Sequence, residues 1–199
     1  MASRTFELPE LKLLVDAVQC SKFVTHKKSN ELIKKIESLA SSHQAMSLQR
    51  QVYVTNRVKT INENIYYNVD RLHAAIAESK QVSFKYFDYN IKKEKQYRKN
   101  GELYFASPYA LSWDDENYYL ITFSEKYNDF THYRVDRMTN IEIVDKPRGV
   151  LPDNEHFNIA DYSKKVFNMF GGEGEMVRLQ FDNLLVNSVI DRFGKDVTL

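Results

Sequence analysis

Cysteine is almost absent from this chain. Cys20 is the single cysteine among 199 residues. One thiol excludes an intrachain disulfide framework and any zinc site built from several cysteines. Folding must therefore depend on a hydrophobic core, and the 43% of hydrophobic residues is enough to form one.

Glycine and proline are also scarce, whereas aromatic residues are abundant. Six glycines and four prolines stand against 13 tyrosines and 12 phenylalanines. Aromatic side chains favour β-strands, and no low-complexity tract or internal repeat is present. This composition predicts aromatic-rich strands joined by short polar turns.

The chain has neither a marked excess of one charge nor a long apolar run. Its formal net charge is +1 at pH 7, so binding to nucleic acid or anionic lipid must come from a local patch. No uncharged run reaches membrane-spanning length, and residues 1–10 lack the basic and apolar blocks of a signal peptide. We therefore expect a soluble, cytoplasmic protein without a membrane partner.

Residue types that often serve catalysis form no recognisable set. The five histidines show no metal-ligand spacing, and no glycine-rich phosphate loop follows a predicted strand. The adjacent carboxylates Asp114 and Asp115 lie in a predicted hairpin turn, where acidic side chains are ordinarily solvated. We expect no enzymatic activity, no metal and no cofactor.

Residues 1–80 follow the helical period. An apolar stripe begins at Leu8, a second helix is predicted after Ser29, and a third begins at Asn68, with the two polar residues as N-caps. Between residues 48 and 65 the pattern fits either a short strand or an extended connector. We interpret residues 1–80 as a helical linker or dimerisation arm.

At Gln81 the pattern changes to strict alternation, which indicates strands. Asn100-Gly101 predicts a type I′ hairpin between residues 96–98 and 103–105, and residues 114–117 predict a second hairpin. A series of short strands joined only by turns forms an antiparallel meander. A sheet this small is expected to close into a barrel, which also removes its edges.

Residues 147–158 contain proline and mixed charge and are interpreted as a linker. A helix at 159–170, a strand at 176–181, a helix capped by Gly194 and the start of a second strand at 196–199 are predicted to follow. Such a β–α–β start cannot bury its own faces. We therefore expect residues 159–199 to be a truncated α/β domain, and the whole chain to be of the α+β class.

Three segments of the meander carry a composite motif: Ser107-Pro108-Tyr109-Ala110-Leu111, Asn117 to Phe123, and Thr131 to Met138. Their order and spacing resemble the WYL-domain transcriptional regulators. Tyr118-Tyr119-Leu120 stand where that family has the Trp-Tyr-Leu triplet for which it is named, so the first letter differs. Tyr133 to Met138 match its closing signature, an aromatic or apolar residue, Arg, any residue, Asp, Arg and an apolar residue.

The resemblance implies an Sm-like β-barrel at residues 81–146, usually preceded by a winged helix-turn-helix that binds DNA. No winged helix is recognisable in residues 1–80, which are like the linker that follows it in the family. We therefore expect a fragment of a bacterial-type regulator, cut at both ends. The resemblance also implies that the helical arm and the C-terminal part supply homodimer contacts.

The predicted strand 130–137 carries the main candidate site. His132 and Arg134 share one face, where a guanidinium fork and an imidazole can bind phosphate; the alternative is a solvated strand face. The resemblance implies that this strand lines a groove for nucleotides or nucleic acid, with Tyr119 as a stacking ring; the alternative places Tyr119 in the core. The candidate ligand-binding residues are Tyr86, Ser107, Tyr119, His132, Arg134 and Arg137.

The other candidates also have structural alternatives. Arg137 fits an ion pair with Asp136 that closes the barrel. Ser107 fits a turn position, although its hydroxyl can donate to a phosphate. Tyr86 and Lys85 lie on opposite faces of their strand, so at most one of them faces the groove.

A basic stretch follows the first predicted strand and is interleaved with aromatic residues. Cations neutralise backbone phosphates and rings accept stacked bases, so this is the best local candidate for a nucleic-acid patch. The alternative is a lysine-rich hairpin that protects a sheet edge from aggregation. The patch consists of Lys92, Lys93, Lys95, Arg98 and Lys99.

We interpret the chain as the ligand-sensing and dimerisation part of a transcriptional regulator. Its barrel is expected to bind a nucleotide or single-stranded nucleic acid and so control a DNA-binding domain absent from this chain. DNA is thus expected as a partner only through that missing domain. The alternative is a non-enzymatic oligomerisation or protein-interaction module that binds no nucleic acid.

Overall fold

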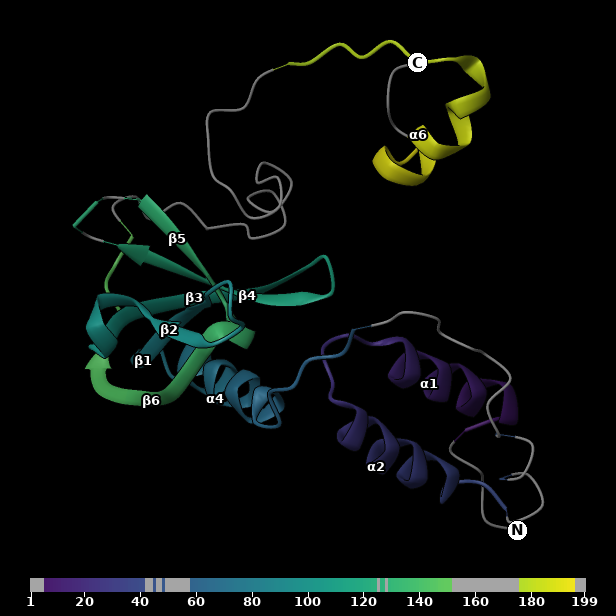
Figure 1. Ribbon diagram of the computed structural model, residues 1–199, viewed down its shortest axis with the longest axis horizontal. Helices are drawn as coiled ribbons and strands as arrows, with labels where there is room; N and C mark the ends of the chain where they lie inside the picture. Colours follow the sequence, from purple (N-terminus) through teal and green to yellow (C-terminus); the bar gives the residue numbers. More distant parts are fainter. Residues whose placement is uncertain are drawn as a thin grey trace.

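Helices come first and a curled antiparallel sheet follows in the computed structural model of this protein (Figure 1). This arrangement confirms the α+β class. The structure describes residues 6–41, 45, 48, 58–124, 126–127, 129–151 and 176–195. The predicted helix at 159–170, the predicted strand at 196–199 and residues 49–57 of the open segment 48–65 lie outside them. The domain boundaries proposed from the sequence stay predictions.

Four α-helices and six strands are described. The helices are α1 Leu8–Cys20, α2 His26–Glu37, α4 Ile65–Ala77 and α6 Val186–Phe193. The strands are β1 Lys80–Tyr89, β2 Lys95–Tyr97, β3 Tyr104–Asp114, β4 Asn117–Ser124, β5 Asp129–Arg134 and β6 Met138–Pro147. Short 3-10 helices are η1 Arg98–Gly101, η2 Val135–Arg137 and η3 Asn183–Leu185.

The predicted N-caps of two helices are wrong, because Ser29 and Asn68 both lie inside a helix. The N-cap of α2 is Thr25, whose Oγ1 accepts a hydrogen bond from the backbone N–H of Lys28 at 3.1 Å. Asn68 is buried on α4, and its Nδ2 donates to the carbonyl of Met138 at 3.2 Å. A buried polar side chain needs a hydrogen-bond partner, and here the partner lies on another element, which the local sequence does not reveal.

The sheet has the strand order β2-β1-β3-β4-β5. β6 also pairs with β1, on the edge opposite β3. All of these pairings are antiparallel, and the sheet curls so that one face becomes concave (Figure 1). Among the described strands no ladder joins β5 to β6. The sheet is therefore a half-barrel, a coarser result than the predicted closed barrel.

The predicted hairpin at residues 114–117 is confirmed. Asp114 pairs with Asn117, and the two residues between them adopt positive φ angles, 42° at Asp115 and 59° at Glu116. A two-residue turn with positive φ matches the twist of the flanking strands. This tight connection joins β3 to β4.

The other predicted hairpin has the right turn and the wrong partners. Asn100 and Gly101 have φ of 52° and 83°, and the N–H of Glu102 donates to the carbonyl of Lys99 at 2.9 Å, as a type I′ turn requires. However, β2 pairs with the end of β1 instead of with β3, and β3 pairs with the middle of β1. The turn therefore joins two strands that share β1 as a neighbour.

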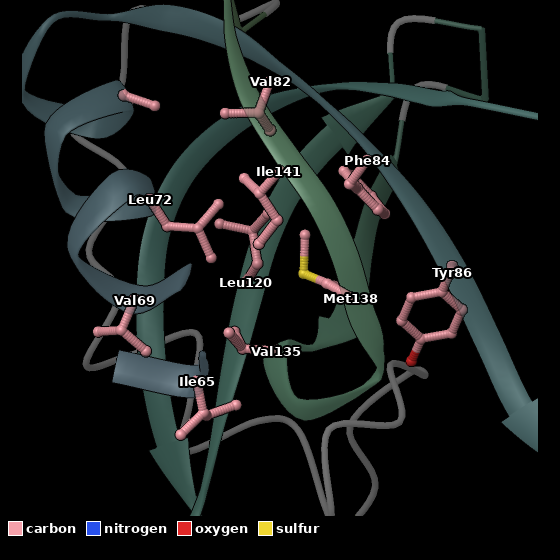
Figure 2. Close-up of a cluster of buried hydrophobic side chains, with 11 residues drawn as sticks. Ile65, Val69, Leu72, Val82, Phe84, Tyr86, Leu120, Val135, Met138 and Ile141 are labelled. Atoms are coloured by element: carbon pink, nitrogen blue, oxygen red, sulfur yellow. The ribbon is translucent and has the colours of Figure 1, made fainter. Parts of the chain in front are cut away.

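The main core lies between α4 and the concave face of the sheet (Figure 2). Leu72 and Ala75 of α4 are fully buried there. Their partners on the sheet and on η2 include Val82, Phe84, Leu120, Val135, Met138 and Ile141. The strand predicted at 130–137 ends at Arg134, because η2 turns the chain and inserts Val135 into this core.

In the described C-terminal part, the predicted helix and its cap are confirmed. Gly194 is the C-cap of α6 with φ of 84°, a conformation that glycine adopts without strain. The strand predicted at 176–181 is wrong, because these residues pair with no described strand. None of the described helices has the length and apolarity that crossing a membrane requires.

Candidate functional site

Four aromatic side chains line the concave face of the half-barrel beside the aliphatic core: Phe84, Tyr86, Tyr104 and Tyr133. The rings of Phe84 and Tyr104 stack with centroids 5.5 Å apart, and Tyr86 meets Tyr133 edge to face at 5.3 Å. Figure 2 shows Tyr86 beyond Phe84 along β1, at the border of the aliphatic cluster. Alternation along β1, β3 and β5 turns these side chains to one face.

Two cations from η1 lie over these rings. The guanidinium carbon of Arg98 is 5.2 Å from the centroid of Tyr86, and the Lys99 Nζ is 4.0 Å from that of Tyr104. A cation is attracted to the negative face of an aromatic ring. The turn after β2 therefore holds two positive charges over an aromatic floor.

One carboxylate joins this group of charges. Arg98 Nε donates to Asp88 Oδ2 at 2.5 Å, and Arg137 Nη1 donates to Asp88 Oδ1 at 3.1 Å. The hydrogen bond from Arg98 lowers the pKa of Asp88, against the opposing effect of its partial burial. The predicted alternative of an Arg137 pair with Asp136 is wrong.

We call this end of the concave face the mouth. It is formed by Tyr86, Asp88, Arg98, Lys99, Tyr104, Tyr133 and Arg137.

A cavity of about 370 Å³ adjoins the mouth. It shares Lys99, Tyr104 and Tyr133 with the mouth, and its other lining residues include Thr122 and Thr131 on the concave face. Hydroxyl groups and an ammonium beside aromatic rings suit a ligand with both a polar and a flat apolar part. The mouth and this cavity together therefore form one candidate site for such a ligand.

Arg134 lies apart from the mouth, held in a bidentate pair. Its Nε and Nη2 donate to the two oxygens of Asp136 at 3.0 and 2.9 Å, and Nη2 also donates to Asn117 at 2.9 Å. Burial opposes the charge of Arg134, but the Asp136 carboxylate outweighs burial and raises the pKa of Arg134. Its fork is therefore already occupied by a carboxylate of this chain.

Arg134 faces a second hollow, a groove of about 530 Å³ between the sheet and the helical part. The groove is lined by residues of both charges and by aromatic rings. Lys95, whose Nζ lies 4.6 Å from the centroid of Phe87, forms one wall with Tyr89. Residues 58–62 and Phe23 form the opposite wall.

Tyr119 and His132 lie on the same side of the sheet as Arg134, opposite the core. Tyr119 is the ladder partner of Arg134, and His132 is that of the buried Ile121. Burial raises the pKa of the half-buried Tyr119, while the Arg134 charge opposes this shift. The core side of β4 carries Leu120 instead, so these three candidates share a face that the mouth does not.

Two predicted candidates form hydrogen bonds within the fold. Ser107 is buried, and its Oγ accepts from the backbone N–H of Gly149 at 2.9 Å. Tyr86 is also buried, and its hydroxyl accepts from the backbone N–H of Arg134 at 3.2 Å. Burial raises the pKa of Tyr86 above its usual value. Ser107 thus fixes the chain after β6, and Tyr86 forms the floor of the mouth.

The predicted basic patch is exposed but divides into parts. Arg98 and Lys99 belong to the mouth, and Lys95 borders the groove. Lys92 and Lys93 lie in the turn between β1 and β2, which Asn90 holds by accepting from the N–H of Lys92 at 2.9 Å. The structure therefore brings part of this patch together with two predicted ligand residues, Tyr86 and Arg137.

Sequence reasoning missed Asp88, Tyr104 and Tyr133 as site residues. The alternation that places Phe84 and Tyr86 on one face also places Asp88 there, and this signal was present. The meeting of Asp88 with Arg137 depends on the curl of the sheet and has no local signal. In the described part of the chain, no cluster of three or more His, Cys, Asp or Glu residues could hold a metal ion.

Comparisons with known proteins identify one domain. The family model of the WYL domain matches residues 67–143, which run from α4 into β6. No curated protein matches the chain. A solved structure of proteasome accessory factor B/C (PafBC) of Arthrobacter aurescens is similar at 14% identity and a TM-score of 0.33. That match covers 72% of this chain but 21% of the PafBC chain, so this chain spans about a fifth of its length.

Proposed function

We propose that this chain, whose residues 67–143 form a WYL domain, is the ligand-sensing part of a bacterial transcriptional regulator. The ligand is a nucleotide or a short single-stranded nucleic acid, and no chemical reaction follows its binding. The observation that carries this proposal is the mouth, where Arg98, Lys99 and Arg137 surround an aromatic floor. In this proposal the half-barrel takes the place of the Sm-like barrel that the family resemblance implies.

The chemistry of the mouth suits a nucleotide in both of its parts. Guanidinium and ammonium groups bind phosphate oxygens through charge-assisted hydrogen bonds. Half-buried Tyr133 offers ring surface to a base, since stacking on aromatic rings tolerates every base. Tyr104 already has Phe84 stacked against its ring and Lys99 above it, so it supports the Lys99 cation. Tyr86 is only 6% exposed and supports Arg98 from below instead of touching the ligand.

A longer single strand reaches beyond the mouth. Lys95 and the aromatic wall of the groove offer further contacts for phosphates and bases. Arg134 enters such a complex through a nitrogen that its pair with Asp136 leaves unused, with His132 and Tyr119 on the same face. In this scheme the mouth binds the first nucleotide, and Lys95, Arg134, His132 and Tyr119 bind the nucleotides next to it.

The signal passes to the helices through an aromatic contact. The ring of Phe23, between α1 and α2, lies 4.7 Å from Tyr118 and 5.7 Å from Trp113. Lys22 adds an ion pair with Glu116 at 3.7 Å. Ligand binding that shifts the sheet relative to these helices can reposition subunits of a homodimer and the DNA-binding domains attached to them. Such a regulator acts in the cytoplasm.

Binding of a labelled single-stranded oligothymidylate, followed by fluorescence anisotropy, tests the proposal. We expect affinity to fall steeply between low and physiological salt, because cations release counterions from the phosphates. Lys99→Ala should weaken binding by about three- to tenfold. Lys34→Ala on the exposed side of α2 removes the same charge away from the mouth and should leave affinity unchanged.

Two results would contradict this function. Absence of binding by the wild-type chain at low salt excludes a nucleic-acid ligand for the mouth. Equal losses in Lys99→Ala and Lys34→Ala show that any cation on the surface contributes, and that the mouth is not the site. Competition by mononucleotides tests whether one nucleotide is sufficient for the mouth.

A second candidate function is an oligomerisation or protein-interaction module. Exposed apolar side chains favour it, notably Leu13 on α1 at 70% exposure and Leu184 before α6 at 87%. Apolar interfaces respond weakly to salt, unlike contacts with phosphates. Self-association that persists in high salt, without nucleic-acid binding, would support this function over the first.

A further inference from the structure

We propose that Asp88 occupies the position of a ligand phosphate between Arg98 and Arg137 and that binding displaces it. The side chain thus acts as an internal competitor that sets the affinity of the mouth. This proposal rests on the function proposed above, because it specifies how the same site accepts an anion.

The geometry of Asp88 is that of a bridging anion. Each of its two oxygens accepts from a different guanidinium, Arg98 at 2.5 Å and Arg137 at 3.1 Å. Two arginines that share one small anion through separate oxygens are a common arrangement around phosphate. A phosphate has further oxygens and more negative charge than a carboxylate, so it satisfies the same two guanidiniums more fully.

Both arginines keep donors for a larger anion. Arg98 uses only Nε, and Arg137 uses only Nη1, in their hydrogen bonds to the described residues. Arg98 is also fixed over the Tyr86 ring, which holds its plane in place without using a donor. The fork of each side chain is therefore only partly used, and that of Arg98 is also held in place.

The balance of charge favours exchange. The mouth holds the three cations Arg98, Lys99 and Arg137 against one carboxylate, since the neighbouring Asp136 is taken by Arg134. A positive charge thus remains when Asp88 is in place. An incoming phosphate meets net attraction even before Asp88 leaves.

The exchange requires little from the fold. The side chains of Asp88, Arg98 and Arg137 are 37%, 53% and 34% exposed, so a ligand can reach both ion pairs from solvent. Exposed ion pairs contribute little to stability in water, and one can be replaced at small cost. Asp88 lies in the last part of β1, outside the main core cluster, and its side chain is 37% exposed to solvent.

The test compares Asp88→Asn with a matched control, Glu94→Gln. Both remove one negative charge from the β1–β2 hairpin, but Glu94 contacts Asn90 and no arginine of the mouth. With labelled oligothymidylate at physiological salt, we expect Asp88→Asn to bind about three- to tenfold more tightly than wild type. Glu94→Gln should change affinity by less than about twofold.

Each outcome separates the two proposals. Equal tightening in Asp88→Asn and Glu94→Gln overturns the role of Asp88, since a general change in field then explains it, and leaves the proposed function intact. Unchanged affinity in Asp88→Asn also overturns the role of Asp88 and leaves the proposed function intact. Absence of binding by wild type and by Asp88→Asn, even at low salt, overturns both proposals.

A measurement on the wild-type chain covers the case in which Asp88→Asn does not fold. Carboxyl carbon NMR follows the titration of Asp88 without ligand and with oligothymidylate bound. Displacement from Arg98 and Arg137 should move the titration of Asp88 toward the range of a free aspartate. A saturating ligand that leaves this titration unchanged overturns the proposal.

Discussion

At the scale of single residues, the mouth combines buried phenols with cations that rest on their rings. Tyr133 is half-buried between Phe84 and Tyr86, with ring centroids at 5.0 and 5.3 Å. Burial disfavours the phenolate and raises the pKa of Tyr133 to about 12. The Tyr133 ring therefore stays uncharged in the mouth, beside the arginines, the lysine and Asp88.

This shift predicts how stability depends on alkaline pH. Between pH 10, where a tyrosine of the unfolded chain loses its proton, and about pH 12, the folded chain holds the Tyr133 proton that the unfolded chain has lost. The free energy of unfolding then falls as pH rises through this window. Tyr133→Phe should reduce this fall, as measured by urea unfolding at pH 8 to 11. Tyr127→Phe, at an exposed position, is the control, and an equal effect in both variants contradicts the prediction.

At the scale of elements, α4 holds the curl of the sheet. Its buried side chains contact strands that are distant in sequence, and Asn68 and Arg71 each donate to a backbone carbonyl of β6. The curl places the end of β1 beside η2, which brings Asp88 to Arg137. Packing of α4 against the sheet therefore supports the contact of Asp88 with Arg137 in the mouth.

Leu72 tests this packing. The residue is fully buried at the centre of α4, so Leu72→Ala removes apolar contacts and leaves a cavity. We expect the free energy of unfolding in urea to fall by about 2–5 kcal/mol. Leu13→Ala on α1, where the leucine is 70% exposed, should change it by no more than about 0.5 kcal/mol. A similar small change at Leu72 would show that α4 does not hold the core.

At the scale of the whole molecule, one aromatic contact connects the helical part to the half-barrel. Phe23 packs against Trp113 and Tyr118 at the tip of the β3–β4 hairpin. Lys59 stabilises the helical side of this contact, because its buried Nζ donates to the carbonyls of Val18 and Ser21 near the end of α1. Movement between the two parts must break or shift this junction.

The single tryptophan reports on this junction. Phe23→Ala removes the ring that covers part of Trp113, and aromatic pairs contribute about 0.5–1.5 kcal/mol beyond their buried area. We expect the emission of Trp113 to shift to longer wavelength while the circular dichroism of the sheet is retained. Phe6→Ala, at an exposed position just before α1, should leave the emission unchanged. Identical emission spectra for Phe23→Ala and wild type would show that Phe23 does not cover Trp113.

Part of the molecule followed from local sequence alone. The helical stripe predicted α1, the turn at residues 114–117 predicted the β3–β4 hairpin, and Gly194 marked the end of α6. The segments around Tyr118 to Leu120 and Tyr133 to Met138 indicated the WYL domain. These features depend on a few adjacent residues, because period and positive φ are properties of the local chain.

The site was decided only by tertiary structure. Asp88 meets Arg98 within the β1–β2 hairpin, 10 residues apart, and Arg137 across 49 residues of sequence, and the second contact needs the curl of the sheet. Arg134 pairs with Asp136 because the strand ends there and η2 turns the chain back. The sequence determined which charged groups exist and on which face of a strand they start. Long-range packing determined which of them form ion pairs, because the energy of an ion pair depends on the distance between its charges, and only the folded chain sets that distance.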